Sequence, residues 1–233
     1  MEWLGLPFIT GLPDSGQVIL SCTHNPFLVL LAYVVACVGS FAMLDMAERV
    51  DHAQKAESRR LWSLTGTACL AGGIWAMHFI GMLAFQAPVE IHYALPITLA
   101  SLLIALLASW LVMLTLSQAQ QTLWRYVRAS VCIGLGIAAM HYVGMGAMRS
   151  EAAAYFEPTL FTLSVLIAML AGLAALLIAR QLRGGMGLPH QLKKYTASLV
   201  LGAGLFSMHF TGMAAFNMVL PAGSALTPAG END

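Results

Sequence analysis

Six apolar segments, each about 20 residues long, constrain the fold of this chain more than any other feature of its sequence. That length is what one α-helix needs to cross the hydrocarbon core of a bilayer. The runs are continuous rather than alternating, which favours helices over a transmembrane barrel. The sequence therefore predicts an all-α membrane protein with six transmembrane helices, at 27–47, 64–85, 95–116, 127–148, 159–179 and 196–219.

The composition agrees with a membrane protein. Of the 233 residues, 59% are hydrophobic and only 9% are charged, whereas a soluble domain carries about 25% charged residues. The formal net charge is zero, which argues against an electrostatic nucleic-acid binder. The first four residues lack the basic region of a signal peptide, so we expect the first apolar run to remain in the protein as a helix.

The basic residues predict the orientation in the membrane. Ten of the eleven lie in the connections between spans one and two, three and four, and five and six, and Arg149 alone lies on the other side. The side rich in lysine and arginine is cytoplasmic by the positive-inside rule. We therefore expect a multi-pass protein of the bacterial cytoplasmic membrane, with both termini outside.

A hexapeptide of the form Met-His-aromatic-x-Gly-Met occurs three times, once in each even-numbered span. Each copy contains a histidine, and an ionisable residue inside a membrane has a functional interpretation by default. The copies occupy 77–82, 140–145 and 208–213. Their regular spacing indicates a helical hairpin repeated three times, with repeats at about 27–85, 95–148 and 159–219.

We expect the three hairpins to close into a bundle with quasi-threefold symmetry, in which the even-numbered helices surround a common axis. The membrane domain would then span 27–219, between an external amino-terminal segment, 1–26, and an external tail, 220–233. His78 and His141 each lie eight residues before the outer end of their span, about 12 Å along a helix. The histidines are thus predicted at a common depth in the outer leaflet.

Helix geometry divides each hexapeptide into two faces. The histidine and the second methionine are four residues apart and share a face, so each helix offers an imidazole and a thioether in line. The leading methionine shares a stripe with two glycines, a pattern typical of close helix packing. The candidate ligands, for copper above other metals, are His78, His141 and His209, then Met82, Met145 and Met213, and lastly Met77, Met140 and Met208.

Other interpretations of these residues remain open. An intramembrane histidine can hydrogen-bond across helices without binding a metal, and methionine is an adaptable packing residue. The in-line methionines either complete a three-histidine shell or form a second site nearer the exterior. Two histidines on facing helices can also hold haem axially.

Polar residues outside the hexapeptides are weaker candidates. His24 and His92 lie on the external side and either cover the site or are solvated. His52 and His190 lie among basic neighbours in cytoplasmic loops, and we expect both to be solvated. Asp45 is expected to pair with Arg49 one helical turn further on.

These residues together resemble the MHYT family, bacterial membrane sensory domains with three Met-His-Tyr-Thr-like motifs near the outer face. The resemblance covers about residues 24–218 and rests on the three hexapeptides and on the segment 40–45, Ser-Phe-Ala-Met-Leu-Asp. Phenylalanine replaces tyrosine in the first and third motifs, and only the third has threonine, Thr211. His24-Asn25 stands where a Tyr-Asp-like pair is common.

The resemblance implies copper binding through the motif methionines and histidines, and sensing of oxygen, carbon monoxide or nitric oxide. Members are often joined to GGDEF and EAL domains, which make or break cyclic di-GMP, and often have a seventh span. Six spans occupy the 233 residues, so we expect no output domain within them. The chain is then either an excised sensor domain or a protein that acts through a partner.

Three hypotheses of function follow. The first is a copper-loaded sensor of a diatomic gas or of redox state, embedded in the lipid bilayer, that signals to a cytoplasmic output such as a cyclic di-GMP enzyme. The second is a copper carrier or channel, and the third is a haem-binding membrane protein. An enzyme is not expected, because no nucleophile accompanies the motif histidines.

Overall fold

A computed structural model describes residues 2–3, 6–8, 18–118, 122–183, 185 and 187–220. Six helices form the body of the molecule: α1 (Pro26–His52), α2 (Ala56–Ala84), α3 (Leu95–Leu116), α4 (Leu123–Met145), α5 (Pro158–Leu182) and α6 (Leu188–Ala214). All six are long and apolar enough to cross a membrane. The predicted all-α membrane fold with six spans is confirmed.

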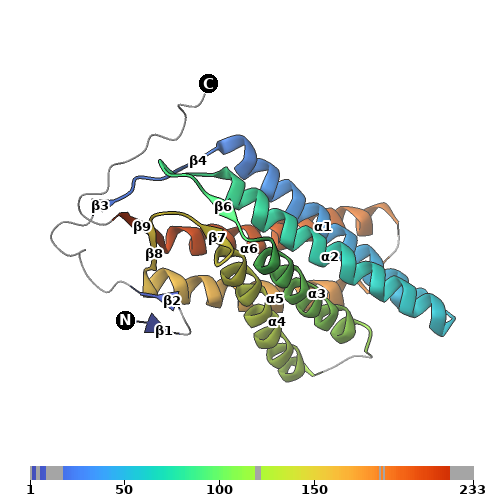
Figure 1. Cartoon of the computed structure of the whole chain (residues 1–233). Coiled ribbons are helices and arrows are strands. Elements are labelled where there is room, and N and C mark those ends of the chain that lie inside the picture. Colours follow the sequence, from blue (N-terminus) through green and yellow to red (C-terminus); the bar gives the residue numbers. More distant parts are fainter. Residues whose placement is uncertain are drawn as a thin grey trace.

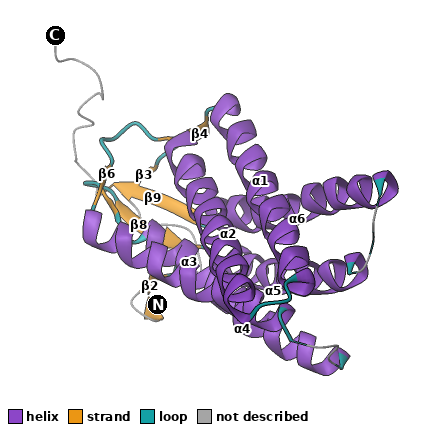
Figure 2. Ribbon diagram, turned by 90° about the vertical axis from the view of Figure 1, so that its right-hand side faces the viewer, coloured by secondary structure: helices purple, strands orange, loops and turns teal. Residues whose placement is uncertain are grey.

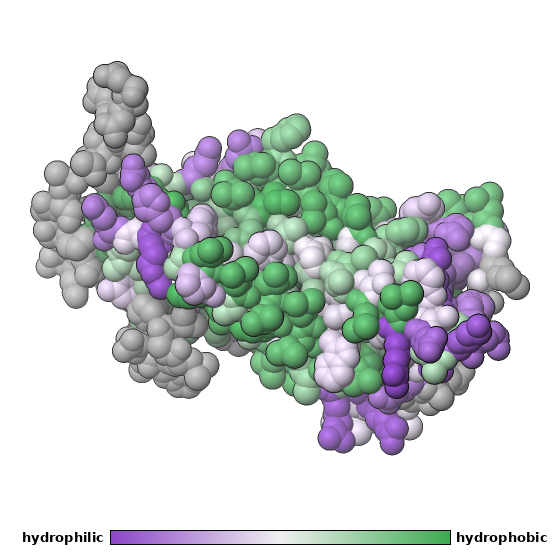
Figure 3. All heavy atoms as spheres, turned by 45° about the vertical axis from the view of Figure 1, so that its right-hand side comes forward, coloured by the Kyte–Doolittle hydropathy of each residue, from purple (hydrophilic) through white to green (hydrophobic). Residues whose placement is uncertain are grey.

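On the face that Figure 3 shows, apolar side chains cover the middle of the bundle in a wide belt, and polar side chains gather toward its two ends. This is the distribution that a bilayer requires of a membrane-spanning bundle. Exposed leucines on the odd-numbered helices, such as Leu103 and Leu170, belong to that belt. The protein is therefore a multi-pass membrane protein.

The helices form a closed ring in which each helix packs against its neighbours in sequence and α1 packs against α6. In the even-numbered helices 50–56% of the apolar window is buried, against 22–33% in the odd-numbered helices. The even-numbered helices α2, α4 and α6 thus lie nearer the centre, as the predicted quasi-threefold bundle requires.

Within each hairpin, one close contact sets the register of the two helices. A methyl group added at Gly73 would lie 2.7 Å from the Cα atom of Gly39 on α1. In the same way, Gly136 faces Ala108 on α3 and Gly204 faces Ala171 on α5, each at 2.9 Å. Small residues allow membrane helices to approach this closely, so this part of the glycine stripe packs helices together, as predicted.

Short strands lie together at one end of the bundle (Figures 1 and 2). Three antiparallel pairs connect the start of each odd-numbered helix with the end of the following even-numbered helix. They are β4 (Thr23–His24) with β5 (Phe85–Gln86), β6 (His92–Tyr93) with β7 (Met148–Arg149), and β8 (Ala153–Phe156) with β9 (Phe216–Leu220). The threefold repeat thus extends beyond the helices.

The remaining strands complete this layer. β3 (Val18–Ile19) pairs with β9, and β1 (Glu2–Trp3) pairs with β2 (Leu6–Pro7). The sequence-based limit of the sixth span, Val219, runs past the end of α6, because the apolar residues of β9 are a strand rather than helix. A short apolar run does not distinguish the two by itself. The predicted tail 220–233 lies outside the described residues except for Leu220.

Residues before the odd-numbered helices explain where two of those helices begin. The side chain of Asn25 accepts hydrogen bonds from the backbone N–H groups of Phe27 and Leu28, at 3.0 and 3.3 Å. Glu157 accepts in the same way from Thr159 and Leu160, at 2.9 and 2.6 Å. Both caps precede a proline at the first helical position, where its missing N–H is not needed.

Candidate metal centre

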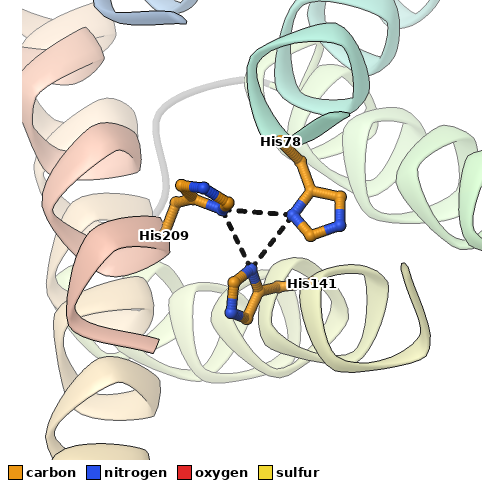
Figure 4. A group of neighbouring side chains, drawn as sticks. All are labelled: His78, His141 and His209. Carbon is orange, nitrogen blue, oxygen red and sulfur yellow. Dashed lines mark hydrogen bonds between the residues drawn. The ribbon is translucent and has the colours of Figure 1, made fainter. Parts of the chain in front are cut away.

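The three motif histidines meet at the centre of the bundle. Figure 4 shows one imidazole from each of α2, α4 and α6 pointing toward the other two. The Nδ1 atom of His78 lies 3.1 Å from those of His141 and His209, which are 3.2 Å apart. All three side chains are fully buried. We call His78, His141 and His209 the histidine triad.

The triangle of Nδ1 atoms cannot be satisfied by hydrogen bonds among the three rings. A neutral imidazole nitrogen either carries a proton and donates or carries a lone pair and accepts. Two of any three such nitrogens are therefore alike, and at least one side of the triangle joins two donors or two acceptors. A cation at the centre that accepts three lone pairs removes this conflict.

The opposite nitrogens of the three rings face the glycines of other helices and lie away from the centre of the triangle. Among the described residues, the buried Nε2 atoms of His78, His141 and His209 have no hydrogen-bond partner. A buried polar group without a partner costs about 1–3 kcal/mol. An ion held by the Nδ1 atoms would leave the proton of each ring on Nε2, so the indication of a bound ion comes from the Nδ1 triangle alone.

The spacing fits a metal of the size that histidine binds. With metal–nitrogen bonds of about 2.0 Å, a tetrahedral centre places its ligand nitrogens about 3.3 Å apart. The observed separations of 3.1–3.2 Å are slightly smaller. The triad is also the group of side chains that meets the geometric requirement for a metal site within the described part of the chain. Three nitrogens leave one tetrahedral position for another ligand.

A glycine from the neighbouring helix makes room for each histidine ring. A methyl group added at Gly144 on α4 would lie 2.3 Å from Nε2 of His78. The same addition at Gly212 would meet His141 at 2.3 Å, and at Gly81 it would meet His209 at 2.2 Å. The glycine of each hexapeptide therefore accommodates the histidine of another hexapeptide. The sequence predicted these glycines as packing residues and did not assign them to the site.

The methionines of the hexapeptides divide into two groups on opposite sides of the triad. Met82, Met145 and Met213 are buried in a cluster with aromatic residues of the strand layer, including Phe85 and Phe216. The leading methionines belong instead to the core between the helices; they are Met77, Met140 and Met208. The two faces inferred from helix geometry thus have different surroundings.

The aromatic residues next to the histidines line the site without bonding to the triad nitrogens. The rings of Phe79, Tyr142 and Phe210 each lie 4.8 Å, centroid to centroid, from the preceding histidine. The Tyr142 hydroxyl forms a 2.5 Å hydrogen bond with the hydroxyl of Ser164 on α5. It therefore joins α4 to α5, and this hydroxyl is directed away from the triad.

The two external histidines differ in their surroundings. The ring of His24 packs against Phe85 and Phe210, at 5.5 and 5.6 Å between centroids. Partial burial lowers the pKa of His24, so the ring is neutral at physiological pH and lies over an aromatic residue of the third hexapeptide. His92 is exposed beside Glu90, at 3.5 Å. His24 is thus the one that lies near the site.

A second group of buried polar residues lies at the other end of the bundle. Lys194 on α6 forms ion pairs with Asp45 and Glu48 on α1, at 2.9 and 2.7 Å. Nε2 of His190 lies 2.5 Å from the Glu48 carboxylate. We call Asp45, Glu48, His190 and Lys194 the ion-pair group. It joins the first helix of the ring to the last.

Two predictions concern this group. Asp45 pairs with Arg49 at 2.8 Å, as the sequence indicated. The prediction that His190 is solvated is wrong, because the residue lies in the first turns of α6 and is buried against Glu48. His52 ends α1 and is exposed, as predicted.

Comparison with known proteins identifies the family. The family described as MHYT, bacterial signalling protein N terminal repeat, matches residues 72–129, 134–188 and 202–229. Each matched segment begins in an even-numbered helix and contains one hexapeptide. The chain belongs to the MHYT family.

The curated relatives that this chain matches are longer signalling proteins. It is 48% identical to the cyclic di-GMP phosphodiesterase NbdA of Pseudomonas aeruginosa, over 97% of this chain and 29% of the relative. It is 40% identical to the bifunctional diguanylate cyclase/cyclic di-GMP phosphodiesterase MucR of the same organism, over 91% of this chain and 30% of MucR. Signaling protein YkoW of Bacillus subtilis is 32% identical over 83% of this chain and 24% of YkoW.

The matched part of these relatives is a minor share of their length. This MHYT domain spans about three tenths of the two Pseudomonas relatives. The 233 residues therefore correspond to the MHYT region of longer relatives that are named for cyclic di-GMP activities. No solved structure matches the chain.

Proposed function

We propose that this MHYT domain binds copper at the histidine triad and senses a diatomic gas or redox state in the membrane. The observation that carries the proposal is the triangle of buried Nδ1 atoms, which hydrogen bonds among the rings cannot satisfy. Imidazole with thioether nearby is a ligand set that suits copper. A copper ion would supply an open coordination position and a change of oxidation state.

The protein supplies the positions of the ligands. His78, His141 and His209 come from three separate helices, so the distances between their rings depend on how those helices pack. Met82, Met145 and Met213 lie on the side of the strand layer, and we propose that a thioether from this group completes the shell. For Met77, Met140 and Met208, predicted as further ligands, burial in the helix core supports a packing role instead.

Signalling follows from the connection between the site and the helices. A change in the geometry that the metal prefers alters the positions of α2, α4 and α6 together, and packed helix interfaces respond by small shifts. The Pseudomonas relatives named for cyclic di-GMP activities support an output of that class. We propose that a cytoplasmic cyclic di-GMP enzyme, in the same protein or in a partner, receives the signal.

The charge distribution supports the orientation that this output requires. The basic residues lie at the end of the bundle opposite the strand layer, except Arg149 in β7. We propose that this basic end is cytoplasmic and that the strands lie outside. Gln54→Cys and Glu151→Cys, each in a chain without its natural cysteines, test this orientation. A thiol reagent that does not cross the membrane, added to intact cells, should label the cysteine at position 151 and not the one at position 54. Labelling of position 54 alone would reverse the orientation.

The two other hypotheses receive less support. Nδ1 atoms 3.1–3.2 Å apart leave no space between them for a porphyrin, which argues against haem at the triad. On the basic side of the triad, the next inward residues are Ile74, Ile137 and Leu205, all buried. An ion path needs polar groups at several depths, and this apolar ring argues against conduction.

Elemental analysis of the purified protein tests the proposal. The wild-type protein should hold copper in a fixed ratio to the chain, and His78→Ala, His141→Ala and His209→Ala should each lower the ratio at least tenfold. His52→Ala and His92→Ala are the matched controls, because both histidines are exposed, and their copper content should equal that of the wild type. Equal copper in all five variants, or a wild-type protein that takes up no copper, would overturn the proposal.

A further inference from the structure

A small cavity lies at the centre of the bundle, on the side of the histidine triad away from the strands. Its volume is about 30 Å³, and every one of the six helices contributes to its wall. Ile74, Ile137 and Leu205 line it, and each of them precedes a triad histidine by four residues. That separation is about 6 Å along a helix, so the cavity is the next space inward from the triad.

The cavity exists because the third hairpin departs from the repeat. The contacts of Gly39, Ala108 and Ala171 with the glycines of the even-numbered helices make these three residues equivalent. The position four residues further on is then Met43 in α1, Val112 in α3 and Ala175 in α5, and all three line the cavity. The side chains become smaller from the first hairpin to the third.

The side chains also become smaller at the position that directly follows Gly39, Ala108 and Ala171. Ser40 in α1 and Ser109 in α3 correspond to Gly172 in α5. A methyl group added at Gly172 would lie 3.3 Å from Cγ2 of Ile133, so α4 already fills the space beside that glycine. The unfilled volume lies at Ala175, where the first hairpin has the larger Met43. Cavities larger than a water molecule are few in a packed protein interior, and this one lies beside the predicted binding centre.

The lining determines what the cavity can hold. A space of about 10–15 Å³ is needed for one water, so this cavity has room for an object about twice that size. A water also needs two to four polar partners. The lining is apolar except for Ser40, whose buried hydroxyl has no hydrogen-bond partner within the described ranges. One hydroxyl does not satisfy two waters, so the site suits a small uncharged molecule.

We propose that this cavity binds a diatomic gas molecule and holds it one helical turn from the triad. Two bonded atoms match the volume, and the apolar wall suits a molecule without charge. The Ser40 hydroxyl provides one hydrogen-bond donor to a weakly polar gas such as nitric oxide. That the cavity delivers gas to a metal at the triad rests on the proposed function. The binding of gas in the cavity does not rest on it.

Xenon provides a direct probe of the cavity. Crystals of the whole chain under xenon pressure should show an anomalous peak between Ala175 and Met43. Ala175→Val, which introduces the residue of the equivalent position in α3, should reduce xenon occupancy at least tenfold. Val112→Ala should keep or increase it. Ala174→Val is the control, because it adds the same two methyl groups to α5 at a position outside the lining.

The outcomes separate this proposal from the proposed function. No xenon peak in the wild type, or equal occupancy in Ala175→Val, would overturn the cavity site even if copper is bound. Copper content that fails to depend on the triad would overturn the metal proposal and leave a positive xenon result standing. In copper-loaded protein, the association rate of nitric oxide should fall about tenfold in Ala175→Val relative to Ala174→Val, and equal rates would overturn the supply role.

Discussion

The histidine triad and the ion-pair group are both buried polar clusters in a membrane protein. The polar atoms of the ion-pair group have complementary partners, whereas those of the triad do not. Each of the four residues in the ion-pair group has a partner at 2.5–2.9 Å. In the triad, the Nε2 atoms have no partner among the described residues, and the Nδ1 atoms face one another. The ion-pair group is explained by the helices that it holds together, whereas the converging Nδ1 atoms of the triad are explained by the proposed copper ion.

The two clusters also differ in symmetry. The triad takes one residue from each hairpin, whereas the ion-pair group takes its residues from α1 and α6 alone. α1 and α6 are the first and last helices of the ring, and no short loop connects them. Lys194 and its carboxylates therefore close the ring of helices, and the threefold centre holds the proposed copper site.

The largest expected effect is on copper affinity, and it concerns the glycines that make room for the triad. Gly144→Ala places a methyl group 2.3 Å from Nε2 of His78, so the ring must move. We expect copper affinity to fall about 10–100-fold, the usual cost of disturbing groups that orient a ligand. Titration with a competing chelator measures this effect.

Gly72→Ala is the matched control for Gly144→Ala. Gly72 is also a helical glycine, and a methyl group added there meets nothing within 4 Å. Its copper affinity should equal that of the wild type. If Gly144→Ala also binds copper normally, the assignment of Gly144 to the site is wrong.

The next effect concerns the ion-pair group. Lys194→Met leaves Asp45 and Glu48 without their shared cation, and we expect the free energy of unfolding to fall by about 2 kcal/mol. The value lies below that of a fully buried pair because the two carboxylates are 25% and 20% exposed and solvent screens them. Thermal unfolding in detergent checks it.

Lys193→Met provides the control for Lys194→Met, because Lys193 is the exposed neighbour on the same helix. Its unfolding temperature should stay near that of the wild type. Both variants should keep the wild-type ratio of copper to protein. Loss of copper in Lys194→Met without unfolding would show that the two clusters are not independent.

A smaller effect separates the two groups of methionines. Leucine replaces methionine at nearly the same volume, so the substitution removes the thioether with little change in packing. Met82→Leu, Met145→Leu and Met213→Leu together should lower copper affinity by about tenfold if one thioether binds the metal. The matched triple variant of Met77, Met140 and Met208 should leave it unchanged. The reverse result would assign the thioether ligand to the core side of the triad.

The smallest effect on stability concerns Glu157, a partly exposed acidic residue that belongs to neither cluster. Hydrogen bonds from the backbone N–H groups of Leu160 and Thr159 lower the pKa of its carboxyl. The stabilisation is therefore present above the ordinary pKa of glutamate and is lost as the pH falls through the lowered value. Glu157→Gln should slightly lower the unfolding temperature at neutral pH, and the difference should disappear in acid.

Glu151→Gln is the control for the effect of Glu157, because Glu151 is exposed and precedes the same helix. It should show no pH-dependent difference from the wild type. Thermal unfolding at a series of pH values measures both variants. A constant difference for Glu157→Gln at all pH values would mean that its carboxylate does not act as a charged cap.

Much of the fold and part of the site could be predicted from particular residues. Hydrophobic length located all six helices, and the repeated hexapeptide selected His78, His141 and His209, which the structure brings within 3.2 Å of one another. The strand β9 was not predicted, because Phe216–Leu220 continues an apolar run. Its strand character depends on pairing with β8, which lies far away in the sequence.

Other features also depended on contacts between distant segments. The burial of His190 requires Glu48 of α1, and the fit of His78 requires Gly144 of α4. These contacts join residues on different helices, so the spacing of residues along one helix does not predict them. Even so, the glycine had a signal in the sequence: it occurs at the same position in all three hexapeptides.

The sequence by itself determined the membrane helices, the threefold repeat and the common depth of the histidines, because each follows from periodicity and length along one segment. The tertiary structure decided which buried polar groups have partners and which do not. It also decided where the repeat fails to fill space, at Ala175. The physical reason is that hydrogen bonding and packing are satisfied between helices, so they depend on which side chains face one another across the bundle.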